Sequence, residues 1–166
     1  MKPYIIIGVI AASIGITLKV LFFVSAKFDV SRLMFSNLAE LAIVALVPIV
    51  AVIYQIKFDS KSSFDQRFRP LIGSSLVCSM LFAGFAFCYF AYINPSFAQH
   101  FVMENEALLK QNAKTPEDFK KVVDFYINHW RPLNQATSAI FGMFFVGLFI
   151  SLIAAGVAGI FGPSKK

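Results

Sequence analysis

Four long runs of apolar residues dominate the chain, and each is long enough to cross a lipid bilayer as a helix. They cover residues 3–24, 38–56, 71–93 and 133–161. A helix that spans a bilayer needs about 20 predominantly apolar residues. The pattern predicts an all-α, polytopic membrane protein in which residues 1–166 form a single domain of four transmembrane helices.

The ends of the runs carry residues that begin or end helices. Pro3 suits a first helical turn, where its missing N–H would be unpaired anyway. We expect Pro70 and Asn94-Pro95 to bracket the third span. The first run could also be a cleaved signal peptide, since Lys2 precedes it, but about 20 apolar residues is long for a signal core. We therefore favour a first span or a signal anchor.

Residues 95–131 have the composition of a water-exposed segment and predict an external helical hairpin between spans three and four. Thr115-Pro116-Glu117-Asp118 resembles a helix start, with a capping hydroxyl, proline in the first turn and acids where the helix dipole favours them. We expect the tip near residues 113–115. Apolar residues recur at helical spacing on both sides of it: Phe97, Phe101 and Leu108 before it, and Phe119, Val122, Val123, Tyr126 and Trp130 after it.

The distribution of basic residues predicts the orientation. An even number of spans puts both termini on one side, and each side carries seven basic residues outside the spans. On the side of the termini they occupy about 20 positions, against about 50 on the other, and short basic segments tend to stay cytoplasmic. We expect both termini in the cytoplasm. Phe64 and Phe68, beside Arg67 and Arg69, predict a short interfacial helix in the cytoplasmic loop.

Composition excludes several classes of protein. Only 14% of the residues are charged and the mean hydropathy is +0.71, whereas a soluble domain has about 25% charged residues. The net charge of +6 does not indicate nucleic-acid binding, because the basic residues are scattered between apolar spans. Cys78 and Cys88 would lie about 15 Å apart on one helix, too far for a disulfide.

Several short motifs resemble a known family. They are Glu40 near the start of span two, the Ile56-Lys57 exit, Asn94-Pro95-Ser96-Phe97, Arg131-Pro132-Leu133-Asn134 and the run of residues 147–155. In this order they resemble small bacterial four-span inner-membrane proteins catalogued as domain-of-unknown-function family 4199. The resemblance implies a four-span topology in the bacterial inner (plasma) membrane and no established activity. The family's gene neighbourhood suggests a lipid-linked sugar transferase as a partner.

Lys19 and Glu40 are the two charged side chains inside the predicted spans. Lys19 lies 17 residues from Lys2 and Glu40 lies 17 residues from Lys57, so both are about 25 Å from the cytoplasmic boundary. A charge within a bilayer is costly, and pairing is the usual remedy. We expect an ion pair between helices; the alternatives are separate snorkelling of Lys19 to the headgroups and a relay for ions or protons.

Small residues line one face of two spans, and in span four they recur at every fourth position. Span four presents Gly147, Ser151, Ala155 and Gly159, and span one presents Gly8, Ala12 and Gly15 on the face of Lys19. Small residues let helix backbones approach closely, which drives association in lipid. These faces predict packing within the bundle or, alternatively, contact with another copy or another protein.

His100, Glu104 and His129 form a weak candidate site in the external hairpin. The two histidines lie about equally far from the tip, and Glu104 is one helical turn from His100. An antiparallel hairpin could bring them together, so a cation site or a pH-sensitive contact is conceivable. Interfacial histidines without a ligand are the favoured interpretation, and we expect no metal and no cofactor.

The sequence lacks the signatures of common enzyme classes, including HExxH, Walker A, GxSxG and CxxC. We therefore expect a non-catalytic integral inner-membrane subunit or scaffold, whose partners are the lipid bilayer and another membrane protein or a second copy. One alternative is a small oligomeric transporter or channel that uses Lys19 and Glu40. The other is an enzyme or helper acting with a lipid-linked sugar transferase.

Overall fold

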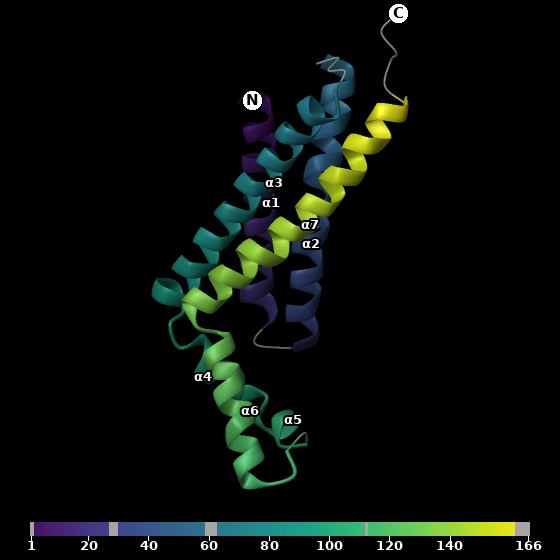
Figure 1. Ribbon diagram of the computed structural model, residues 1–166. Helices are drawn as coiled ribbons and strands as arrows, with labels where there is room; N and C mark the ends of the chain where they lie inside the picture. The colour runs from purple at the N-terminus through teal and green to yellow at the C-terminus, as the bar shows by residue number, and fades with distance from the viewer. Residues whose placement is uncertain (1, 27–29, 59–62, 112, 162–166) are drawn as a thin grey trace, which may run out of the picture.

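A computed structural model of the protein describes residues 2–26, 30–58, 63–111 and 113–161 of the 166-residue chain. These residues are almost entirely helical and include no strand. In chain order the elements are α1 (Lys2–Ala26), α2 (Val30–Phe58), α3 (Phe64–Cys88), the π-helical turn η1 (Tyr89–Ile93), α4 (Phe97–Glu104), α5 (Glu106–Gln111), α6 (Pro116–His129) and α7 (Pro132–Phe161) (Figure 1).

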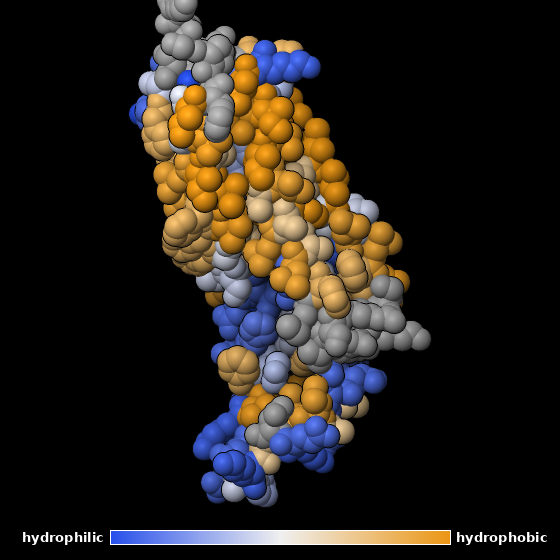
Figure 2. Space-filling model, turned by 90° about the vertical axis from the view of Figure 1, so that its right-hand side faces the viewer, coloured by the Kyte–Doolittle hydropathy of each residue, from blue (hydrophilic) through white to orange (hydrophobic). Residues whose placement is uncertain are grey.

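Four segments are long and apolar enough to cross a membrane: Pro3–Val24, Phe35–Phe58, Phe64–Ile93 and Pro132–Ile160. Their apolar side chains cover most of the bundle surface seen in Figure 2, whereas hydrophilic residues gather on the hairpin below it. Such a surface is stable only against lipid. The predicted all-α, four-span architecture is confirmed, and the chain is a multi-pass membrane protein.

The hairpin between the third and fourth spans has the predicted form. α4 and α5 run out from the bundle and α6 returns beside them (Figure 1). The hydroxyl of Thr115 accepts a hydrogen bond from the backbone N–H of Asp118 at 3.1 Å, and Pro116 occupies the first turn of α6. The predicted helix start is therefore confirmed, and the tip lies where the sequence placed it.

The prediction that Pro70 brackets the third span is wrong. α3 begins six residues earlier, at Phe64, where the Ser63 hydroxyl accepts from the backbone N–H of Gln66 at 3.3 Å. Pro70 lies inside the helix and has no N–H to donate to the carbonyl of Gln66 four residues before it. The side chain of Gln55 on α2 donates to that carbonyl instead, at 3.2 Å. A neighbouring helix thus replaces the hydrogen bond that proline removes.

The prediction of a separate interfacial helix around Phe64 and Phe68 is also wrong. Both residues belong to the first turns of α3, and their rings stack with centroids 5.7 Å apart.

At its other end, the third span stops at Asn94-Pro95, as predicted. The π-helical turn η1 precedes it, and the backbone N–H of Asn94 donates to the carbonyl of Tyr89 at 2.7 Å.

α3 packs against the other three spans, α1, α2 and α7, and its most extensive contact is with α7. Its contact surface carries three fully buried serines, Ser74, Ser75 and Ser79. Each hydroxyl donates to a backbone carbonyl one turn earlier in α3, at distances of 2.7 to 3.2 Å. We call these residues the serine stripe. They are small enough for close packing, and their hydroxyls need no partner from another helix.

Glycines of the neighbouring helices rest against the serine stripe. A Cβ atom on Gly8 of α1 would lie 2.5 Å from the carbonyl oxygen of Ser74, and one on Gly147 of α7 would lie 2.6 Å from the Cβ of Ser75. Both contacts are closer than side chains permit. Glycine at these two positions is therefore required by the spacing of the helices.

The small-residue faces predicted in spans one and four pack mainly against other helices of the same chain. Ser151 and Ala155 are buried together with Gly147, and in α1 the residues Ala12 and Gly15 are buried as well. Gly159 is exposed near the end of α7. The structure therefore uses these faces for packing within the bundle, the first of the two alternatives, with Gly159 at the margin.

We predict that Ser151→Leu and Ala155→Leu each lower the melting temperature of the detergent-solubilised protein, because a larger side chain pushes α7 away from α3. Overpacking of this kind costs about 1–3 kcal/mol. Phe149→Leu is the matched control, since Phe149 is 66% exposed on the same helix. Equal melting temperatures for the buried and exposed substitutions would show that this face is not a packing seam.

Candidate functional site

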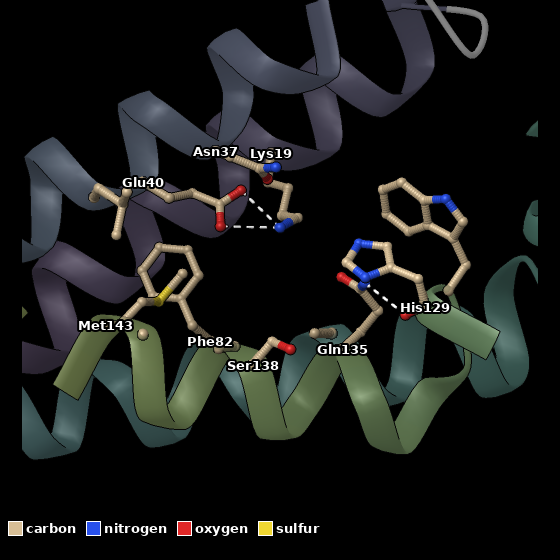
Figure 3. Close-up of a pocket in the computed structure, with 13 residues that line it drawn as sticks. Lys19, Asn37, Glu40, Phe82, His129, Gln135, Ser138 and Met143 are labelled. Atoms are coloured by element: carbon tan, nitrogen blue, oxygen red, sulfur yellow. Dashed lines mark hydrogen bonds and ion pairs between the residues drawn. The ribbon is translucent and has the colours of Figure 1, made fainter. Parts of the chain in front are cut away.

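A polar cavity of about 180 Å³ lies where the bundle meets the hairpin, and we call it the junction pocket (Figure 3). One wall is formed by Lys19 of α1 with Asn37 and Glu40 of α2. Gln135 and Ser138, from the first turns of α7, form the opposite wall. Residues of α3 and α6 complete the lining, so five helices contribute to this pocket.

The charged residues of the pocket form an ion pair between α1 and α2. Lys19 Nζ lies 2.7 Å from Glu40 Oε1 and 2.9 Å from Oε2, and the hydroxyl of Ser36 donates to Oε1 at 3.3 Å. The side chains of Lys19 and Glu40 are only 10% and 5% exposed. The structure thus brings together the two residues that the sequence placed at one depth, and Lys19 does not extend away alone to the membrane surface.

The local fold explains the depth of this pair. α1 and α2 are joined by a short connection, so residues two to three turns before and after it come to the same level. Gly15, one turn before Lys19, lies against the ring of Phe82 on α3. The ring of Phe23, one turn after it, has its centroid 5.5 Å from Lys19 Nζ, within range of a cation–π contact.

The wall formed by α6 and α7 is fixed by two side-chain amides. Gln135 Nε2 donates to the carbonyl of His129 at 2.9 Å, and Asn134 Nδ2 donates to the carbonyl of Asn128 at 2.7 Å. The last carbonyls of a helix have no partner within it, so these amides complete the C-terminus of α6. They also hold α6 at a defined position relative to α7.

His129 faces the junction pocket from the end of α6 (Figure 3). Its ring stacks on Phe125, with centroids 6.0 Å apart, and meets the ring of Trp130 edge to face at 5.1 Å. Desolvation by burial lowers the pKa of His129 below its ordinary value of 6.5. The neutral imidazole, which offers one donor and one acceptor, is therefore the main form at pH 7.

Toward the chain termini the pocket ends on an apolar floor. Phe82 and Met143 line the pocket, and both belong to the buried apolar cluster that fills the middle of the bundle. The other members of that cluster are Ala12, Val44, Val47 and Cys78. The pocket is thus a polar recess at one end of the bundle.

The weak external site predicted from His100, Glu104 and His129 does not form as a group. His100 and Glu104 are exposed on α4, whereas His129 faces the junction pocket. Among the residues that the structure describes, no three His, Cys, Asp or Glu side chains lie close enough to hold a metal ion.

Asn37, Gln135 and Ser138 were not predicted as site residues. Polar residues at the start of span four, which also include Asn134 and Thr137, are the signal that could have indicated them. Such residues are ordinary at a membrane boundary, so their convergence becomes visible only when α2 and α7 are placed together.

We predict that Lys19→Met and Glu40→Gln each lower the free energy of unfolding by about 3 kcal/mol, because the remaining buried charge loses its partner. The double substitution should cost less than the sum of the two, by at least about 1 kcal/mol. Denaturant unfolding of the purified protein in detergent measures this cycle, and Lys57→Met, at an exposed position on α2, is the control. Additive effects would show that the pair does not stabilise the bundle.

Comparisons with known proteins place the chain in a family. Neither the search of curated proteins nor the search of solved structures gave a significant match. The model of the family described as "Protein of unknown function (DUF4199)" matches residues 5–158. Because this match covers nearly the whole chain, the protein belongs to the DUF4199 family, as the sequence motifs indicated.

Proposed function

We propose that this multi-pass protein is a non-catalytic subunit or scaffold of the bacterial inner membrane that binds a larger membrane complex through its hairpin. The observation that carries the proposal is the aromatic packing of the base of the hairpin against the bundle. A segment held in one orientation can present a defined surface to a partner without a large loss of conformational entropy.

Aromatic side chains from five elements, α1, α3, η1, α4 and α6, make this attachment together with Trp130. Phe23 of α1 stacks on Tyr89 of η1 with centroids 4.4 Å apart. Phe97 of α4 lies 4.8 Å from Trp130, which follows α6, and Phe101 lies 5.4 Å from it. Aromatic pairs at such distances add about 0.5–1.5 kcal/mol each beyond the area they bury. This aromatic cluster connects the hairpin to α1 and α3 at once.

Two large apolar side chains of the hairpin are mostly exposed. Met103 of α4 is 71% exposed and Phe125 of α6 is 63% exposed. α6 also presents exposed charged residues, among them Lys120, Lys121 and Asp124. Exposed Met and aromatic residues within a polar surface are enriched where proteins bind one another. These features support a protein partner on the hairpin.

The geometry of the junction pocket favours this proposal over the transporter or channel alternative. Lys19 and Glu40 neutralise each other, and the pocket ends on Phe82 and Met143 rather than continuing as a polar path. Transport routes are lined by polar groups that exchange with water or ions. A role as helper of a lipid-linked sugar transferase is compatible with the scaffold proposal and would be recognised by the identity of the partner.

We predict that the tagged protein, purified from its native membrane in mild detergent, retains a stoichiometric membrane-protein partner. Met103→Ser combined with Phe125→Ser should release that partner, because both changes remove exposed apolar contacts. Lys120→Ser, another exposed change on α6, is the matched control and should retain it. A pure homo-oligomer unaffected by the double change would contradict the scaffold proposal and favour a transporter.

We also predict that the hairpin lies on the outer side of the membrane and that both termini lie in the cytoplasm. Cysteines introduced singly at Ser63 and Lys114, both exposed, test this in a background without Cys78 and Cys88. A membrane-impermeant thiol reagent should label position 114 on intact cells and position 63 only after permeabilisation. Labelling of position 63 on intact cells would reverse the orientation.

A further inference from the structure

The junction pocket lies at the depth of lipid headgroups. α7 enters the membrane near Pro132, so Gln135 and Ser138 lie within its first two turns, about 10 Å or less from the boundary. Figure 2 shows hydrophilic surface between the apolar bundle and the hairpin. A polar recess at this depth lies beside the headgroups of the hairpin-side leaflet, independently of the partner proposed for the hairpin.

The side of the pocket between α2 and α7 is accessible from the membrane. Asn37 and Leu41 of α2 are exposed, and Ser138 and Gly142 of α7 are exposed opposite them. A Cβ atom on Gly142 would meet nothing within 4 Å. Space is therefore open beside this glycine, and a headgroup can enter from the same leaflet while its acyl chains remain along the apolar faces of α2 and α7.

The charges and the volume of the pocket restrict the ligand. Lys19 and Glu40 supply one cation and one anion, and the remaining polar lining consists of amide, hydroxyl, imidazole and indole groups. A ligand with net charge would leave an uncompensated charge in a partly buried site. The volume of about 180 Å³, equal to that of about six water molecules, is large enough for one small polar headgroup.

We propose that the junction pocket binds the zwitterionic headgroup of phosphatidylethanolamine from the hairpin-side leaflet. The carboxylate of Glu40 is the acceptor for the primary ammonium group, and Lys19, Asn37 and Ser138 supply donors for the phosphate. A quaternary ammonium has no N–H to donate to Glu40, so phosphatidylcholine lacks this interaction. Phosphatidylglycerol carries the phosphate without an ammonium group, so it offers Glu40 no cation and brings an uncompensated negative charge beside the Lys19–Glu40 pair.

Lipid titration of the purified full-length protein, followed by native mass spectrometry, tests the proposal. Phosphatidylethanolamine should bind with a saturating stoichiometry of one, and phosphatidylcholine and phosphatidylglycerol with the same acyl chains should bind about tenfold more weakly, a difference of about 1.4 kcal/mol. Equal binding of the three lipids would overturn the proposal. Displacement of the lipid by an equal concentration of soluble glycerophosphoethanolamine would assign the pocket to a soluble ligand and also overturn it.

Two leucine substitutions at exposed glycines of α7 make the test specific to the pocket. Gly142→Leu fills the pocket from its open side, whereas Gly156→Leu, also with open space around its Cβ position, lies away from it. Gly142→Leu should abolish the saturable binding, and Gly156→Leu should leave it unchanged. Asn37→Leu, from the opposite wall, should repeat the loss. Retention of the lipid by both pocket variants, at wild-type melting temperature, would contradict the proposal.

Discussion

The close approach of α3 to α1 and α7 determines the arrangement of the bundle. Lipid tails are as apolar as the helix surfaces, so the hydrophobic effect does not drive the spans together, and dispersion contacts must do so. Gly8 and Gly147 permit those contacts at the serine stripe. The serine hydroxyls donate to carbonyls of their own helix. The contact face of α3 can therefore consist of small, buried side chains without leaving these hydroxyls unpaired.

This close packing also determines where charge can be placed. α1 and α7 are held against the middle of α3, and Lys19 and Glu40 meet beyond it, where Gln135 and Ser138 supply further polar groups. A buried ion pair is tolerated when its geometry is good and hydrogen bonds satisfy the remaining atoms. The hydrogen bond from Ser36 to Glu40 contributes to this. The charged pair and the polar groups around it therefore lie at the base of the hairpin, between the hairpin and the apolar middle of the bundle.

Much of this architecture follows from local sequence signals. The four spans are read from run length, the start of α6 from Thr115 and Pro116, and the level of the ion pair from the equal distances of Lys19 and Glu40 from basic residues at the span ends. The start of α3 could not be predicted in this way, because the side chain that replaces the hydrogen bond lost at Pro70 is Gln55, which belongs to another helix. The junction pocket escaped prediction for the same reason, since its walls come from five helices and no segment carries its pattern.

The hydrogen bond from Gln55 to the carbonyl of Gln66 has an evolutionary consequence. Pro70 removes the usual donor to the carbonyl of Gln66 and a side chain of α2 supplies another, so we expect the positions of Gln55 and Pro70 to be selected together. A homologue with a residue other than proline at the position of Pro70 regains the backbone donor and frees the position of Gln55 to become small or apolar. Paired substitution at these two positions in other members of the family would therefore show that α2 and α3 pack in the same register there.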